Sequence, residues 1–332
     1  MTRNTATETV WRQHEGFFTA GDGTRIGFSD TGNRKAPTTV LFLHGWTQNR
    51  EAWDDVAGPL HERDPELRII ALDHRGHGKS DAAPEGTVNV RQLATDAADF
   101  INAEIPAGQI VIVGHSMGGM TMMGLGEYHP GLVAQRISGA VFVATSAGRL
   151  LHRLRVVPPV FQVVKAVILG VVAQGWFLQQ GYLMRPIIST LVFGRDPRPY
   201  DVSRVWDQIR SGTPRSYKDA AESMVLHEDL TEGLSAYRGM PTAVLAGDRD
   251  FLTPAGDSRI IAAALQTNEL RTYPGSGHML PNERSSEVVN EIVTVLEALG
   301  QPAAPVTRGN PPASCTGPEV AAEWPRSPSR SP

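Results

Sequence analysis

The feature that most constrains this chain is a short apolar run that leads directly into a glycine-flanked serine. Residues 110–113 read Ile-Val-Ile-Val, which is typical of a buried strand. Residues 114–118 read Gly-His-Ser-Met-Gly, and a helix-like apolar pattern follows them. A G-x-S-x-G motif between a strand and a helix predicts a nucleophile elbow, a sharp turn that presents a serine hydroxyl at the end of a strand. The candidate nucleophile is therefore Ser116.

Apolar strands alternate with helices on both sides of this motif. Continuous apolar strands separated by helices predict an α/β fold with a mostly parallel, doubly wound sheet that is buried on both faces. A hairpin signal at residues 21–23 adds two strands, 17–19 and 25–29, before the parallel ones. The other strands are predicted at 38–43, 68–72, 110–113, 138–144, 242–246 and 269–273, and the helices at 53–62, 89–104, 117–128, 256–265 and 285–299.

The alternation stops between residues 145 and 238, where the pattern is mostly helical. We interpret 145–238 as a helical cap inserted into an α/β core made of 16–144 and 239–300. Residues 1–15 are expected to be a flexible N-terminus, and 301–332, rich in Pro and without a periodic apolar pattern, a disordered tail. We expect the cap to lie over the active site. Its apolar stretch 160–178 leaves peripheral contact with a lipid surface as an alternative and disfavours a membrane span, because polar residues interrupt it.

Composition narrows the class of protein. The chain has 332 residues, of which 41% are hydrophobic and 20% charged, as in a soluble globular enzyme with room for a pocket. The net charge of −4 shows no basic excess, so nucleic acid is not an expected partner. The single cysteine, Cys315, excludes an intramolecular disulfide, and the polar N-terminus lacks the apolar segment of a secretory signal. We therefore expect a cytoplasmic location.

A serine hydroxyl is a weak nucleophile that needs a neighbouring base, and the base needs an orienting acid. His278 lies in a glycine-flanked loop between the last predicted strand and the last helix, which makes it the candidate base. The turn at residues 247–250, also directly after a strand, offers two candidate acids, Asp248 and Asp250. Loops at the carboxyl ends of the strands of an open α/β sheet converge, so these groups are expected to meet Ser116. Spacing alone does not choose between the two aspartates.

Acyl transfer also requires N–H groups that bind the oxyanion of the intermediate. One expected donor is the backbone N–H of Met117, the residue after the nucleophile. The other is expected in the loop that follows strand 38–43, where the N–H of Trp46 is the best candidate. His44 and Gly45 are expected to shape this loop, with His44 structural rather than catalytic.

Taken together, these motifs resemble the α/β-hydrolase superfamily over residues 17–300. The resemblance implies that the acid is the last residue of the G-D-x-D turn, Asp250, and that residues 73–80 form a turn that braces the site. A serine at the elbow argues against the epoxide hydrolases and haloalkane dehalogenases, and the absence of a His-Gly-Gly-Gly run argues against the hormone-sensitive-lipase branch. The motifs are His44-Gly45-Trp46, residues 73–80, 114–119 and 247–250, and Gly277-His278.

The resemblance implies a serine esterase or lipase-like enzyme with a helical cap and no metal or organic cofactor. The apolar cap favours a small hydrophobic acyl or aryl ester, or a monoglyceride, as the substrate. A competing hypothesis is hydrolysis of a carbon–carbon bond in ring-cleavage products, for which Arg149, Arg153 and Arg155 would bind the dienoate. The same triad would also suffice for a cofactor-free perhydrolase, and the fold can serve a non-catalytic ligand-binding protein.

Overall fold

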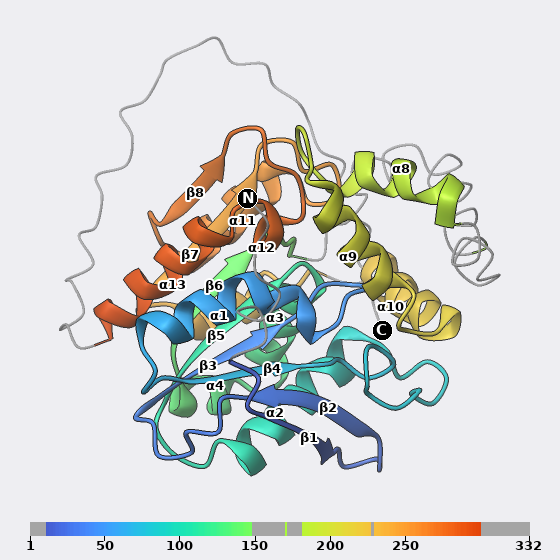
Figure 1. Cartoon of the computed structure of the whole chain (residues 1–332). Helices are drawn as coiled ribbons and strands as arrows, with labels where there is room; N and C mark the ends of the chain where they lie inside the picture. Colours follow the sequence, from blue (N-terminus) through green and yellow to red (C-terminus); the bar gives the residue numbers. More distant parts are fainter. Residues whose placement is uncertain (1–10, 148–169, 171–180, 227–228, 300–332) are drawn as a thin grey trace, which may run out of the picture. The chain divides into compact units, whose positions relative to one another are not determined.

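The computed structural model describes residues 11–147, 170, 181–226 and 229–299, which all belong to one compact unit, Met1–Gln301 (Figure 1). The expected disordered tail at 301–332 lies outside the described residues. So does the apolar stretch 160–178, apart from residue 170, and so do the arginines proposed to bind a dienoate, Arg149, Arg153 and Arg155.

An eight-stranded sheet forms the centre of the fold, with the strand order β1-β2-β4-β3-β5-β6-β7-β8. At one end of the sheet, β1 pairs with β2 and β2 pairs with β4 in the antiparallel direction. Every other pairing is parallel. The predicted mostly parallel sheet is confirmed. The strands are β1 (His14–Thr19), β2 (Arg25–Asp30), β3 (Thr38–Leu43), β4 (Arg68–Leu72), β5 (Gln109–His115), β6 (Ile137–Val143), β7 (Thr242–Gly247) and β8 (Leu270–Tyr273).

Helices cover both faces of the sheet. Along β3, Leu41 and Leu43 pack into one apolar cluster while Val40 and Phe42 pack into another, as expected for a strand whose side chains alternate between two buried faces. The first cluster includes side chains of α2 (Val90–Glu104), α3 (Met117–Tyr128), α4 (Pro130–Arg136) and α11 (Ala255–Leu265), and the second those of α1 (Asp54–Arg63) and α13 (Ser285–Ala298). Two short helices, η1 (Arg50–Trp53) and α12 (Leu280–Glu283), precede α1 and α13.

The structure corrects the sequence interpretation at the N-terminus. The ordered fold begins before residue 16, because Trp11 is fully buried and its indole N–H donates to Asp54, 3.2 Å away. The expected flexible N-terminus is therefore wrong for residues 11–15, while residues 1–10 lie outside the described residues. The helix predicted at 117–128 is observed as α3, and a second helix begins directly after it, at Pro130. Proline occupies the first turn of this second helix, α4, where its missing N–H costs nothing.

The described residues between β6 and β7 are mainly helical. They form α8 (Gly181–Val192), α9 (Pro199–Ile209), α10 (Pro214–Leu226) and the 3₁₀ helix η2 (Glu232–Tyr237). Figure 1 shows α8, α9 and α10 grouped on one side of the sheet. A small apolar cluster joins them to the loops of the sheet, because Trp206 and Tyr217 pack with Met279, and Trp46 lies against them.

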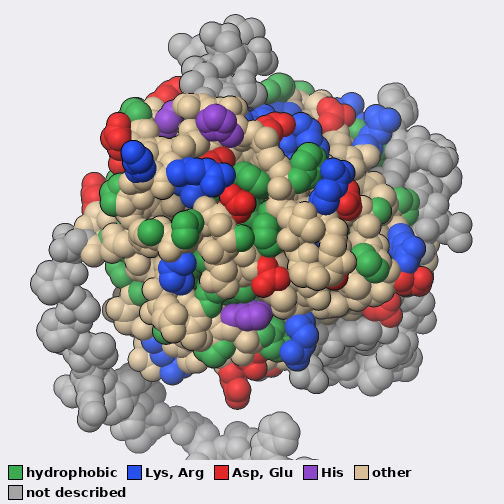
Figure 2. Space-filling model, turned by 90° about the horizontal axis from the view of Figure 1, so that it is seen from below, with side chains coloured by type: hydrophobic (Ala, Val, Ile, Leu, Met, Phe, Trp, Pro, Cys, Tyr) green, Lys and Arg blue, Asp and Glu red, His purple; other side chains and the backbone are tan. Residues whose placement is uncertain are grey.

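The charge of the surface and the apolarity of the helices concern the partners expected from the sequence. On the face drawn in Figure 2, acidic and basic side chains are interspersed among polar and apolar ones. Among the described residues, no helix combines the length and apolarity needed to cross a membrane.

Candidate active site

The elbow is built as a strained turn between β5 and α3. Ser116 has φ 52° and ψ −116°, a left-handed backbone that costs about 1–3 kcal/mol for a residue other than glycine. Its N–H donates to Val143 O of the neighbouring strand, 2.9 Å away. A Cβ on Gly118 would lie 2.1 Å from Leu43 O, and one on Gly114 would lie 2.6 Å from Gly118 O. Both glycines are therefore required for the close approach of helix to strand.

The three predicted side chains meet at the end of this strand. His278 Nε2 lies 2.9 Å from Ser116 Oγ, and His278 Nδ1 lies 2.7 Å from Asp250 Oδ2. All three residues are nearly inaccessible, with exposed fractions of 8% for Ser116, 5% for Asp250 and 4% for His278. The arrangement can pass a proton from the hydroxyl to the imidazole while the carboxylate orients the ring.

Geometry distinguishes the two aspartates of the turn after β7. Asp250 Oδ1 accepts the backbone N–H groups of Leu252 and Thr253 at 2.8 and 2.9 Å, and Oδ2 accepts the Thr253 hydroxyl at 2.7 Å. Burial alone would raise the pKa of Asp250, but the charge of His278 and these hydrogen bonds outweigh it and hold the pKa below its ordinary value. Asp248 is exposed, and it accepts the N–H of Gly275 at 2.7 Å, which joins the turn after β7 to the loop after β8.

The two expected oxyanion donors are available. Met117 is fully buried and Trp46 partly so, and within the described part of the chain neither backbone N–H has a hydrogen-bond partner. Because buried N–H groups are almost always paired, two N–H groups without a partner are candidate donors to an anionic oxygen. The Trp46 indole N–H donates to Tyr217 O at 3.0 Å, which connects the loop after β3 to α10.

Gln48 is a site-building residue that the sequence analysis missed. Its Oε1 accepts the N–H of Gly45 at 2.9 Å and lies 2.7 Å from His115 Nδ1. The other ring nitrogen of His115 lies 2.8 Å from His278 O. Gln48 and His115 thus link the loop after β3 to the loop of His278, and of these two residues only His115 belongs to a motif.

Buried histidines brace the loop at residues 73–80. His44 Nε2 accepts the N–H of His74 at 2.9 Å, so Nδ1 carries the proton and donates to Gly45 O at 2.7 Å. Burial lowers the pKa of His44 well below its ordinary value, which keeps the ring neutral. Asp73 accepts the N–H of Lys79 at 2.8 Å and closes the same loop. These contacts give His44 a structural position, in line with the sequence analysis.

Among the described residues, no group of three or more His, Cys, Asp or Glu side chains is placed to hold a metal ion. The described site is made of a serine, an imidazole, a carboxylate and two backbone N–H groups. These are the parts that acyl transfer requires.

Sequence comparisons relate the chain to known proteins. Residues 40–292 match the model of the alpha/beta hydrolase family. A non-heme haloperoxidase of Rhodococcus erythropolis is 26% identical over 295 residues, which cover 85% of this chain and 99% of that protein. A monoacylglycerol lipase of Mycolicibacterium smegmatis is 26% identical over 264 residues, which cover 77% of this chain and 86% of that protein.

A solved structure has the same fold. The thermophilic esterase from Thermogutta terrifontis superposes with a TM-score of 0.67 at 23% identity, and the match covers 87% of this chain and all of that one.

Proposed function

The chain belongs to the alpha/beta hydrolase family, and from that premise we propose that it is a serine hydrolase that cleaves carboxylic esters through an acyl-enzyme. The observation that carries the proposal is the buried line of contacts from Ser116 Oγ to His278 at 2.9 Å and from His278 to Asp250 at 2.7 Å. The lipase among the relatives and the esterase among the similar folds support it.

In the proposed reaction, Ser116 Oγ bonds to the ester carbonyl carbon as its proton passes to His278 Nε2. Asp250, ionised at neutral pH, stabilises the imidazolium. The carbonyl oxygen becomes an oxyanion that the N–H groups of Trp46 and Met117 bind, each such donor contributing about 2.7–4 kcal/mol to lowering the barrier. The alcohol leaves with the proton from His278. Water, deprotonated by the same ring, then releases the acid and restores the serine.

The proposed substrate is a small hydrophobic acyl or aryl ester, or a monoglyceride. Support comes from the apolar side chains that the described helices between β6 and β7 place beside the oxyanion loop, Trp206 and Tyr217 among them. Burying acyl carbons against such side chains contributes about 0.8 kcal/mol per CH₂, so activity is expected to change with chain length. Peripheral contact with lipid through the cap and a cytoplasmic location remain part of the proposal.

A second candidate is perhydrolysis, which the match to the Rhodococcus haloperoxidase along nearly its whole length favours. Hydrogen peroxide would replace water at the second step. His278 would take the peroxide proton, the peroxide oxygen would bond to the acyl carbon, and Ser116 would leave with a proton as a peroxy acid forms. The same residues serve both reactions. Only the nucleophile that attacks the acyl-enzyme differs: water in hydrolysis and hydrogen peroxide in perhydrolysis.

One experiment addresses both candidates. A series of p-nitrophenyl esters from acetate to decanoate is hydrolysed with and without hydrogen peroxide, and peroxy acid is measured by halide oxidation. The proposal predicts hydrolysis in water with a clear chain-length optimum, abolished in Ser116→Ala. Turnover that requires peroxide favours the second candidate, and Ser116→Ala with parental activity rejects both.

A further inference from the structure

Glu283, the last residue of α12, holds the loop of His278 from both sides. Its carboxylate accepts the N–H of Gly277, 3.0 Å from Oε2 and 3.1 Å from Oε1. It also accepts the N–H of Met279 at 3.1 Å. These two residues flank His278 in the sequence. One side chain, Glu283, therefore binds the backbone N–H groups on both sides of His278.

The same carboxylate reaches the segment that leaves α8. Glu283 Oε2 accepts the N–H of Gly194 at 2.8 Å. Beside it, Val192 O accepts the N–H groups of His278 and Met279 at 2.8 and 3.2 Å. The end of α8 and the histidine loop are therefore joined both by direct backbone hydrogen bonds and through Glu283.

The two segments pack so closely that no side chain fits between them. A Cβ on Gly194 would lie 2.1 Å from Gly275 O, and a Cβ on Gly277 would lie 2.5 Å from Gly194 N. Arg195 N–H donates to Gly275 O at 2.8 Å and continues the contact. Movement of the segment after α8 would consequently be transmitted to the loop of His278.

Backbone donors alone compensate the charge of Glu283. Within the described part of the chain, its carboxylate has no ion-pair partner, and its acceptors face the N–H groups of Gly194, Gly277 and Met279. Burial raises the pKa of Glu283, and these hydrogen bonds oppose the rise. A partly buried carboxylate without a cation is costly unless its acceptors are used, which makes this one sensitive to loss of either oxygen.

We propose that Glu283 is a positioning residue for His278: by binding the N–H groups on both sides of the imidazole and that of Gly194, it fixes the base against Ser116 and couples the base to the segment after α8. The proposal rests on the proposed ester hydrolysis. Among the described residues, the hydrogen bonds of Glu283 reach backbone N–H groups and not the side chains of Ser116, His278 or Asp250. Glu283 acts through the position of the ring, where a displacement of about 1 Å can cost about 10²-fold in rate.

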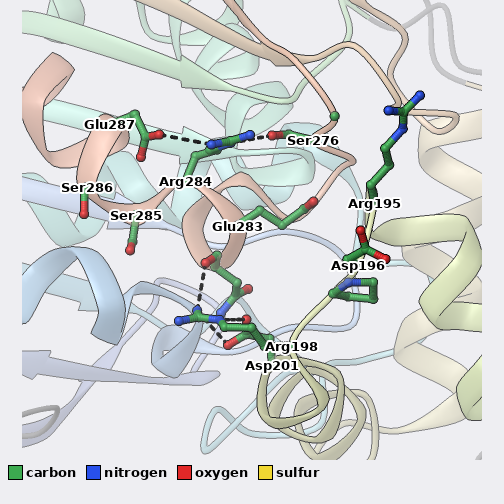
Figure 3. A pocket seen from close by; sticks show the side chains of 13 residues that line it. Arg195, Asp196, Arg198, Asp201, Ser276, Glu283, Arg284, Ser285, Ser286 and Glu287 are labelled. Atoms are coloured by element: carbon green, nitrogen blue, oxygen red, sulfur yellow. Dashed lines mark hydrogen bonds and ion pairs between the residues drawn. The ribbon is translucent and has the colours of Figure 1, made fainter. Parts of the chain in front are cut away.

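Solvent reaches Glu283 through a polar cavity of about 310 Å³. Figure 3 shows Glu283 extending from its helix toward the segment that carries Arg195 and Asp196, with Arg284 and Glu287 on the opposite wall. A small carboxylate such as formate can therefore enter from this side when the glutamate side chain is removed.

Glu283→Gln is the test variant, because it keeps the shape and replaces one acceptor oxygen with an N–H₂ group that would face a backbone donor. Glu287→Gln is the matched control, since Glu287 lines the same cavity and its carboxylate lies 3.4 Å from Arg284 Nη1 rather than against the loop of His278. With a p-nitrophenyl ester, we expect Glu283→Gln to lower kcat by about 10- to 100-fold and to leave KM within about twofold. Glu287→Gln should match the parent.

Further measurements separate positioning from folding and from failure of the proposed function. In Glu283→Ala, added formate should restore part of kcat and leave Glu287→Gln unaffected. If Glu283→Gln does not fold, Glu283→Asp, which keeps both acceptor oxygens, should fold with unchanged KM and reduced kcat. Parental kcat in folded Glu283→Gln, or a rise in KM that accounts for the whole loss, overturns the positioning role. A parent chain without esterase activity instead overturns the proposed function.

Discussion

Asp250 Oδ2 lies 2.7 Å from Nδ1 of His278, close enough to hold the ring in the tautomer that can accept a proton from a hydroxyl. The carboxylate is buried and fully hydrogen-bonded, while Asp248, in the same turn, is exposed and bonded to Gly275. The two aspartates therefore form a matched pair for testing the identity of the acid.

We expect Asp250→Asn to lower kcat for an ester by about 10⁴-fold, because the amide can favour the wrong imidazole tautomer and cannot stabilise the imidazolium. Asp248→Asn should retain kcat within about twofold, since its amide oxygen still accepts the N–H of Gly275. Steady-state kinetics of the two variants beside the parent measure the difference. A larger loss in Asp248→Asn than in Asp250→Asn would exchange their roles.

A second prediction concerns the stability that depends on the elbow glycine Gly118. In Gly118→Ala the new Cβ would lie 2.1 Å from Leu43 O, so either the strand or the helix must move. We expect a loss of about 1–3 kcal/mol or more in the free energy of unfolding, or no folded protein. Gly131→Ala is the control, because nothing lies within 4 Å of its Cβ and alanine favours a helix by about 0.5–1 kcal/mol. Urea unfolding of both variants would show equal effects if the elbow were loosely packed.

The buried histidines predict acid lability. Burial lowers the pKa of His74 and His115 to about 3 and that of His77 to about 4, against an ordinary value of 6.5. Between these values the unfolded chain binds more protons than the folded one, so stability falls as the pH falls below about 6.5. Each histidine contributes at most about 1.4 kcal/mol per pH unit.

Urea unfolding between pH 7.5 and 5 measures this slope. His77→Asn should flatten it, because the amide can still donate to Arg75 O, as the ring does at 3.1 Å, but does not titrate. An identical slope in parent and His77→Asn would mean that acid acts elsewhere.

Local sequence signals were enough for the fold class and for the membership of the family. The strands and the serine of the elbow are marked by neighbours in the sequence, so the parallel sheet and the turn at Ser116 follow from short stretches. The choice between Asp248 and Asp250 needed the resemblance, because both stand in one turn and only the path of the backbone separates their side chains.

What the sequence did not reveal depends on contacts between distant segments. Gln48 and Glu283 bind backbone N–H groups, which any residue supplies, so no motif marks their partners. Trp11 is buried by α1 through a contact 43 positions along the chain, and for that reason a polar N-terminal stretch was interpreted as flexible.

The most direct test of the central claim is labelling with a fluorophosphonate, which reacts with a serine only when a neighbouring base activates it. We expect one covalent adduct, located by mass spectrometry on the peptide that contains Ser116, and almost none in His278→Ala. An intact folded chain that takes no label, or one that is labelled equally well without the imidazole, would contradict it.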